Sequence, residues 1–354
     1  MFIIISILIF GIIIAIHELG HFLAARAFGV GVPEFAIGMG PVLLKKQGKE
    51  TLYTLRAIPL GGFCAMDGDD NDENSDKSLL KKPIWQRFII FIAGSAMNIA
   101  AGFLIALILS ATMTGFASTT LSGFAEGFPH EAREGEEGFM VGDRFHSIDG
   151  IRIYQQSNIP FFLHLNTEDT VDIVVIRDGT RVALNNLPLE PRVYPGSPHP
   201  RYGFNFYFND APTVLDHLAF SGNLTRDFIR QPPLTLRMFI SGQAGVEDVS
   251  SVVGIVDIMH QIGTEAETTQ MAIQSFLLIS ALITVVVAIF NLLPIPGLDG
   301  GRIFLMLITA GIEKVSGRKV DPKYEAYINT AGMVLLFGFM IYIVFQDIFN
   351  IVTR

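Results

Sequence analysis

Two histidines and a glutamate in the first apolar run of the chain are spaced for metal chemistry. His17, Glu18 and His21 belong to the segment HELGH. On a helix, residues i and i+4 lie on one face, so both imidazoles can bind a single metal ion. Glu18 lies beside them and can take a proton from a water molecule whose pKa zinc lowers to about 7. We therefore expect His17 and His21 to be metal ligands and Glu18 to be a general base.

The setting of this segment strengthens the expectation. HExxH also occurs by chance in soluble helices, and histidines near a helix end can simply cap the helix or extend to a membrane surface. Ionisable side chains inside a membrane span, however, cost about 2.5–3.5 kcal/mol each on insertion scales, which favours a functional role for them.

A third ligand is expected from a different part of the sequence. Catalytic zinc sites usually have three protein ligands and a water, and the remaining histidines lie far from the first apolar run. Asp299 lies in NLLPIPGLDGG, residues 291–301, where prolines and glycines interrupt a helix after a long apolar run. Interrupted backbone at membrane depth must be buried in protein or line a wet cavity. Asp299 is the candidate ligand, and a turn with a helix-capping aspartate is the alternative.

Long apolar segments must position these residues. Of the 354 residues, 50% are hydrophobic and 17% are charged, whereas soluble chains carry about a quarter charged residues. This composition excludes disorder, a coiled coil and a disulfide scaffold, and the net charge of −9 argues against nucleic acid as a partner. Four runs are long enough to span a membrane, at about 2–28, 88–113, 271–293 and 328–348. A cleavable signal peptide is the alternative for the first run, which lacks the basic region of such peptides.

The middle of the chain has a different pattern. VGDRFHSIDG at 141–150 and TVDIVVIRDGTRVAL at 170–184 alternate like β-strands with Asp-Gly turns. We predict an α-helical membrane protein with about four transmembrane helices and an inserted small β-rich domain. The expected parts are a membrane core at 1–116 and 271–354, the β-rich domain at 117–200, and amphipathic helices on the membrane surface at 201–270.

The lysines predict the orientation of the spans. All nine lie at 45–82 or 314–323, in the loops after the first and third spans, and none lies between residues 117 and 270. Basic residues near span ends favour the cytoplasmic side. The termini and the β-rich domain are therefore expected outside the cell membrane.

Two motifs of the sequence, taken together, resemble those of a known family. HELGH in a first span together with NLLPIPGLDGGR near a third is similar to the site-2 protease family of intramembrane zinc metalloproteases, and most similar to the bacterial branch with one PDZ domain that cleaves anti-sigma factors. EFAIGMGP at 34–41, IPLGGFCAM at 58–66 and VGDRFHSIDG, with its PDZ-like pattern, add to the resemblance. GSAMN at 94–98 and SSVVGIV at 250–256 resemble family segments in which proline replaces Ser95 and Val252.

The resemblance implies roles for further residues. His17, His21 and Asp299 would hold the zinc ion (Zn²⁺), and Glu18 would act as general base and later donate a proton to the amine. Asn98 and Asn291 would hydrogen-bond the substrate backbone or stabilise an oxyanion, with helix–helix hydrogen bonding as the alternative.

The hairpin segment is implied to bind substrate as well. Gly61, Gly62 and Met66 would belong to an edge strand that pairs with a substrate as its helix unwinds, with a purely structural hairpin as the alternative. The PDZ-like domain would hold an extended peptide or exclude substrates with a large outer domain.

The expected function is therefore an intramembrane zinc endopeptidase in the bacterial inner membrane, with its site open toward the cytoplasmic side. Its expected partners are the lipid bilayer and single-span membrane proteins, such as anti-sigma factors or signal-peptide remnants, and not nucleic acid. A catalytically silent PDZ scaffold is the alternative, and it predicts a damaged metal site. A transporter would need a matching helix break in another span, and a protease of prenylated proteins would be expected to use glutamate as the third ligand.

Overall fold

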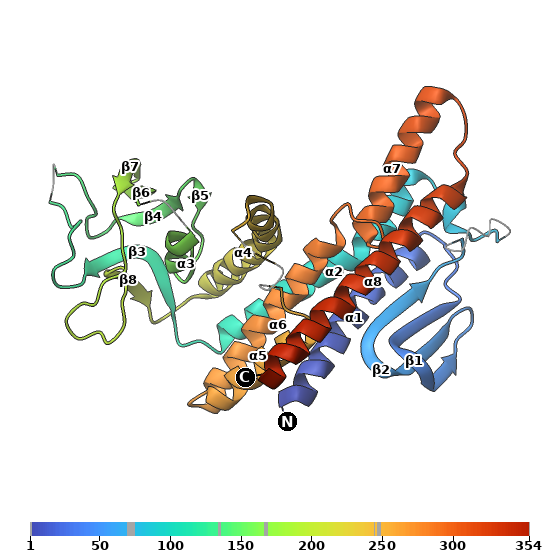
Figure 1. Cartoon of the computed structure of the whole chain (residues 1–354), viewed down its shortest axis with the longest axis horizontal. Coiled ribbons are helices and arrows are strands. Elements are labelled where there is room, and N and C mark those ends of the chain that lie inside the picture. Colours follow the sequence, from blue (N-terminus) through green and yellow to red (C-terminus); the bar gives the residue numbers. More distant parts are fainter. Residues whose placement is uncertain are drawn as a thin grey trace. The chain divides into compact units, whose positions relative to one another are not determined.

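The computed structural model describes residues 2–68, 75–133, 136–165, 169–243, 245 and 249–353. The chain divides into two compact units (Figure 1). The first comprises residues 1–106 and 228–354, and the second comprises residues 107–227. Each unit is described by itself below.

Four helices in the described part of the chain are long and apolar enough to cross a membrane. They are α1 (Phe2–Ala27), α2 (Ile84–Ala111), α6 (Thr269–Asn291) and α8 (Pro322–Thr353). The prediction of a mainly helical membrane protein with about four spans is confirmed. The last helix begins before the predicted residue 328, because proline is well tolerated at the first helical position, where its missing N–H would have no partner.

Glycines let α1 and α2 approach each other closely. A methyl group on Gly20 of α1 would lie 2.3 Å from the Ala93 backbone oxygen of α2. Only a residue without a side chain allows this contact. Beyond it, a buried cluster packs the end of α1 against the start of α2 and against α7 (Asp299–Ser316); its members include Ala25, Val30, Leu79, Ile90 and Met306.

A curved hairpin lies against α1. It consists of β1 (Glu34–Gln47) and β2 (Leu52–Ala65), whose ribbons are curved (Figure 1), and parts of each strand pair with two stretches of the other. Residues 34–37 pair in parallel with 52–55 and also face 62–65 in the opposite direction, with Phe35 opposite Cys64. In the described part of the chain no other strand pairs with 62–65, so this segment is an edge.

An ion pair links the two strands of this hairpin. Glu34 Oε1 accepts hydrogen bonds from Arg56 Nη2 at 2.8 Å and from Thr54 Oγ1 at 2.7 Å. The hydrogen bond from Arg56 is the main cause that lowers the pKa of the Glu34 carboxyl, so the pair stays ionised at neutral pH. Residues 34–37 and 52–56 are thereby held in register.

A shorter helix, α5 (Val252–Glu265), packs against α1, α6 and α8. Its start is bound by Asp347, a buried carboxylate on α8. Asp347 Oδ2 accepts hydrogen bonds from the Ser251 N–H at 2.6 Å, from the Ser251 hydroxyl, and from the Gly254 N–H at 3.2 Å. A charge inside a spanning helix is thus satisfied by the N-terminus of a neighbouring helix, where backbone N–H groups lack partners.

The second unit is rich in β-strands, as the alternating sequence predicts. Its strands follow the order β7-β6-β4-β3-β8, and β5 pairs with β4. β6 and β7 form a predicted hairpin whose turn residues Asp178 and Gly179 both have positive φ. The elements of this unit are β3 (Phe116–Phe124), β4 (Arg144–Ile148), β5 (Ile151–Arg152), α3 (Asn158–Leu165), β6 (Val171–Arg177), β7 (Thr180–Leu187) and β8 (Phe204–Asn209). The sheet therefore includes a strand after residue 200, and α4 (Val214–Ser241) follows it.

Replacing the buried carboxylate should loosen α5. We expect Asp347→Ala to leave the Ser251 and Gly254 N–H groups without an acceptor, at a cost of roughly 1–3 kcal/mol. Hydrogen exchange measured by mass spectrometry on the detergent-solubilised chain should become faster in residues 252–265. Asn350→Ala, an exposed position on the same helix, is the control. Equal exchange in both variants would contradict the anchoring role of Asp347.

Candidate metal centre

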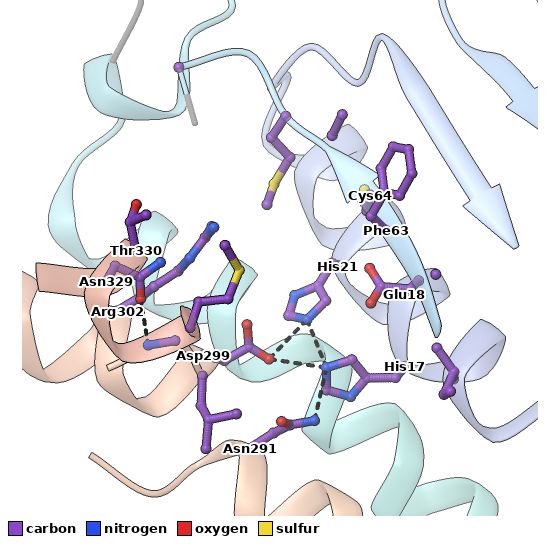
Figure 2. Close-up of a pocket in the computed structure, with 18 of the residues that line it drawn as sticks. His17, Glu18, His21, Phe63, Cys64, Asn291, Asp299, Arg302, Asn329 and Thr330 are labelled. Carbon is purple, nitrogen blue, oxygen red and sulfur yellow. Dashed lines mark hydrogen bonds and ion pairs between the residues drawn. The ribbon is translucent and has the colours of Figure 1, made fainter. Parts of the chain in front are cut away.

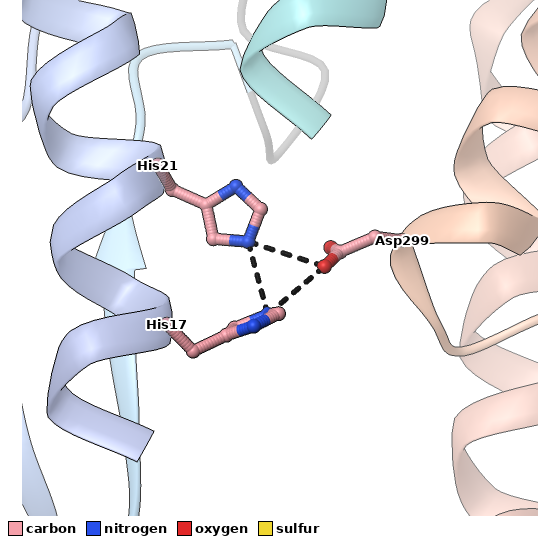
Figure 3. Close-up of side chains that lie close together, drawn as sticks. All are labelled: His17, His21 and Asp299. Atoms are coloured by element: carbon pink, nitrogen blue, oxygen red, sulfur yellow. Dashed lines mark hydrogen bonds and ion pairs between the residues drawn. The ribbon is translucent and has the colours of Figure 1, made fainter. Parts of the chain in front are cut away.

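The two histidines of the first span point to the same place. His17 and His21 lie four residues apart on α1, and their exposed fractions are 7% and 5%. Neither imidazole therefore extends to a membrane surface. Figure 3 shows both rings turned toward Asp299, which comes from the start of α7.

Three ligand atoms from these residues form a tight triangle. His17 Nε2 and His21 Nε2 lie 3.0 and 3.1 Å from Asp299 Oδ2, and 3.2 Å from each other. Neighbouring ligands of a tetrahedral zinc ion with bonds of about 2.0 Å are about 3.3 Å apart, so the triangle has the size of one zinc face. Two imidazole nitrogens and one carboxylate oxygen also leave a fourth position, as catalytic zinc sites do. These residues fit zinc.

The far side of one imidazole fixes its orientation. His21 Nδ1 lies 2.8 Å from the Ile90 carbonyl oxygen on α2. Because a carbonyl can only accept, Nδ1 must carry a proton, and Nε2 is the ring nitrogen that remains to bind a metal ion. This bond is the outer support that metal-binding histidines usually have. His17 Nδ1 is buried and has no hydrogen-bond partner among the described residues.

Gly94 on α2 makes room for both rings. A methyl group at this position would lie 2.3 Å from His21 Nε2 and 2.9 Å from His17 Cε1. The helix therefore packs directly on the metal-binding edges of the imidazoles. Sequence reasoning included Gly94 in the GSAMN segment but did not give it a role.

Asp299 lies at the start of α7, where glycines allow the helix backbone to pack against the preceding turn. Methyl groups on Gly300 and Gly301 would lie 2.2 and 2.1 Å from the backbone oxygens of Leu292 and Ile295. The start of α7 thus sits directly on the turn that follows α6. Leu298 occupies the N-cap position and makes no side-chain capping bond. Asp299 follows as the first helical residue, and its carboxylate faces the histidines instead of capping the helix.

The last span holds this turn in place. Asn329 Oδ1 on α8 accepts a hydrogen bond of 2.9 Å from the Gly297 N–H. Gly297 has φ of +98°, a conformation that L side chains rarely adopt, and a methyl group on Gly332 would lie 2.2 Å from the Pro296 oxygen. A polar residue such as Asn329 inside an apolar span is a sequence feature that could have indicated this contact.

A cavity of about 760 Å³ opens beside the ligand triangle (Figure 2). His17, Glu18, His21, Asn291 and Asp299 line it, and so does the hairpin edge from Gly62 to Met66. Arg302 and Thr330, which sequence reasoning did not single out, line it as well.

Glu18 and Asn291 lie beside the ligand atoms without joining them. The Glu18 carboxylate accepts a hydrogen bond from the Cys64 backbone N–H, so it lies between the metal ligands and the hairpin edge. Asn291 Nδ2 lies 3.5 Å from His17 Nε2. A carboxylate in this place can exchange a proton with groups in the cavity, and the amide can contact a bound molecule.

Two of the predicted residues lie elsewhere. Gly61 is not among the residues that line the cavity, and its φ of +92° indicates a role in bending β2. Asn98 is fully buried on α2 and does not line the cavity either. The amide oxygen and nitrogen of Asn98 have no hydrogen-bond partner among the described residues.

A buried His–His–Asp cluster carried by apolar helices, with a glutamate beside it, has the ligand types and the arrangement that a zinc hydrolase requires. Comparison with known proteins identifies the family, because the sequence model of peptidase family M50 matches residues 5–339 of the chain. The chain belongs to this family, which is the site-2 protease family that its sequence motifs resemble.

Relatives match over nearly their whole length. A protein of Clostridium perfringens named as a zinc metalloprotease is 33% identical over 98% of both chains. The regulator of sigma-W protease RasP of Bacillus subtilis is 25% identical over 97% of both chains. The metalloprotease MmpA of Caulobacter vibrioides is 28% identical over 96% of this chain and 93% of its own.

The protein is thus a metalloprotease, and its cofactor is zinc. The alternative of a catalytically silent scaffold predicted a damaged metal site, whereas the described site has a complete ligand set.

Filling the space at Gly94 should disrupt this site. We expect Gly94→Ala to push the imidazoles apart and to weaken zinc binding at least about tenfold, because even outer-shell changes cost 10–100-fold. Competition with a chromophoric chelator measures the affinity. Gly311→Ala on α7 is the matched control, since a methyl group there has no atom within 4 Å. Unchanged affinity in Gly94→Ala would contradict the packing of α2 on the histidines.

Proposed function

We propose that this protein is an intramembrane zinc endopeptidase that cleaves single-span membrane proteins within or beside their transmembrane helix. The observation that carries the proposal is the ligand triangle of His17, His21 and Asp299, which joins a helix long and apolar enough to span a membrane to the broken segment after another. Ionisable side chains in such a place raise the free energy of membrane insertion, and their presence therefore supports a functional role.

The residues of the chain have separate roles in the proposed reaction. When bound, zinc lowers the pKa of water and polarises a carbonyl group. Glu18, beside the ligands and outside their triangle, takes a proton from the attacking water on a carboxylate oxygen and delivers it to the leaving amine nitrogen. Asn291, in the cavity wall, donates a hydrogen bond to the substrate carbonyl.

The hairpin edge is the proposed substrate platform. Among the described strands only β1 pairs with residues 62–65, and these residues line the cavity together with Met66. A substrate helix must unwind before its peptide bonds can be attacked, and an edge strand provides backbone hydrogen bonds for the extended segment. Gly62 lies beside the site, since a methyl group there would be 3.0 Å from the Ala36 backbone oxygen and 3.4 Å from Glu18 Cγ. Gly61 is assigned to the same platform through the bend it gives to β2.

The proposed substrates follow from the family and from one relative. RasP carries the name regulator of sigma-W protease, which connects this relative with the regulation of a sigma factor. For this chain we propose anti-sigma-factor-like proteins or signal-peptide remnants as substrates in regulated intramembrane proteolysis. We propose that the chain is embedded in the lipid bilayer.

The proposed orientation rests on the lysine pattern. The lysine-rich hairpin loop and the loop after α7 face the cytoplasm, and the site opens toward that side of the bacterial inner membrane. The segment at 117–200 is proposed to be a PDZ-like extracytoplasmic domain that holds peptides or excludes bulky substrates. The helices within residues 201–270 are proposed to lie at the membrane surface, and the two parts of the membrane core are proposed to be 1–116 and 271–354.

Two substitutions separate zinc binding from proton transfer. We expect Asp299→Ala to lose zinc because a ligand is removed, and Glu18→Gln to keep zinc because Glu18 is outside the ligand triangle. Cleavage of a single-span reporter in detergent should fall below detection in both variants. Zinc per chain is measured by mass spectrometry of the purified protein.

Each role can fail on its own. Tightly bound zinc in Asp299→Ala would show that Asp299 is not a zinc ligand. Cleavage near the wild-type rate in Glu18→Gln would show that Glu18 is not the general base. Zinc binding by the wild type without cleavage of any single-span reporter would overturn the proposed activity.

The edge-strand proposal is tested through the substrate backbone. We expect N-methyl groups on alternate residues of a substrate peptide to raise KM roughly tenfold, because each lost backbone hydrogen bond costs about 0.5–1.5 kcal/mol. Moving the methyl groups by one residue provides the control, since the N–H groups of a strand point alternately toward and away from its partner. Equal KM values in the two registers would count against strand pairing.

A further inference from the structure

Four buried polar atoms near the metal site lack partners among the described residues. They are His17 Nδ1, Ser95 Oγ, and the amide oxygen and nitrogen of Asn98. Ser95 and Asn98 are both 0% exposed on α2, and His17 is 7% exposed. Unpartnered polar atoms are costly in an apolar interior, so a set of them in one region indicates a shared hydrogen-bonding partner.

The packing of α1 on α2 brings these atoms to one side of the site. His21 meets α2 at Ile90, and His17 meets it at Gly94, so the two helices run antiparallel. Asn98 lies one turn beyond Gly94 on the same face of α2. Helical side chains lean toward the N-terminus of their own helix. In antiparallel helices, His17 and Asn98 therefore lean toward each other.

The chemistry of a metal-binding histidine requires an acceptor at this point. When Nε2 binds the metal, Nδ1 carries a proton and normally donates it to an outer partner. His21 has such a partner in the Ile90 carbonyl, whereas His17 has none among the described residues. Asn98 offers an amide oxygen as an acceptor. His17 Nδ1 and Asn98 Oδ1 make no direct hydrogen bond in this structure, so a contact between them would run through a bridging water.

We propose that Asn98 is a positioning residue for the zinc ligand His17. Its amide oxygen accepts, through one buried water, the hydrogen bond that His17 Nδ1–H donates, and the Ser95 hydroxyl is a further partner of that water. This inference rests on the proposed role of His17 as a ligand. It gives Asn98 a role different from the substrate contact that the family resemblance implies, in keeping with its place outside the cavity lining.

Zinc affinity of the full-length chain in detergent tests the proposal without using activity. Asn98→Leu removes the acceptor at similar size and should weaken zinc binding 10–100-fold in chelator competition. Asn98→Asp keeps an oxygen acceptor and should stay within a few-fold of wild type. In the cobalt-loaded protein, the visible spectrum should shift in Asn98→Leu and remain close to that of the wild type in Asn98→Asp.

Thr284→Val on α6 is the matched control. Thr284 is also fully buried in a span, but its hydroxyl bonds to its own helix at the Ser280 carbonyl. This variant should keep wild-type zinc affinity. Thermal unfolding of each variant shows whether the fold is retained, and Asn98→Asp keeps the test informative if Asn98→Leu does not fold.

The outcomes separate the proposals. Zinc affinity within twofold of wild type in Asn98→Leu, together with a raised KM for the reporter, would overturn the positioning role and support substrate contact. Equal loss of zinc in Asn98→Leu and Asn98→Asp would also overturn it, because the acceptor would not matter. Zinc retained in His17→Ala would refute the proposed ligand set itself.

Discussion

A charged, polar metal site inside an apolar bundle is the constraint on which the rest of this structure depends. Apolar surroundings offer few hydrogen-bonding partners, so the structure supplies protein partners that hold two of the three candidate ligands in place. The Ile90 carbonyl supports His21, and Asn329 supports the turn that presents Asp299. The same rule applies away from the site, where Asp347 accepts hydrogen bonds from the start of α5. These polar groups each have a protein partner, whereas His17 Nδ1 and the side chains of Ser95 and Asn98 have none among the described residues.

Backbone proximity is the second requirement, and glycine provides it. Gly20 and Gly94 let α1 and α2 touch at the histidines, while Gly300 and Gly301 let α7 rest on the turn after α6. Any side chain at these positions would separate the elements that carry the three ligands. The ligand distances of 3.0–3.2 Å depend on this close packing.

Much of this arrangement could be predicted from the residues. The i, i+4 spacing of His17 and His21 and the interrupted helix around Asp299 predicted a shared site, because helix geometry and the cost of intramembrane charge are local rules. The roles of Gly94 and Asn329 could not be predicted, because they depend on how separate helices cross. For the same reason the sequence did not show that Asn98 lies outside the cavity. The hairpin edge was expected, but the pairing of residues 34–37 with both 52–55 and 62–65 required the three-dimensional structure.

The central claim is that His17, His21 and Asp299 bind zinc inside the membrane core. X-ray absorption at the zinc edge of the purified, zinc-loaded chain tests it most directly. The account predicts only nitrogen and oxygen neighbours at about 2.0–2.1 Å, with the outer scattering of two imidazoles. A sulfur neighbour at about 2.3 Å would contradict it, because Cys64 lines the same cavity and is the one cysteine of the chain.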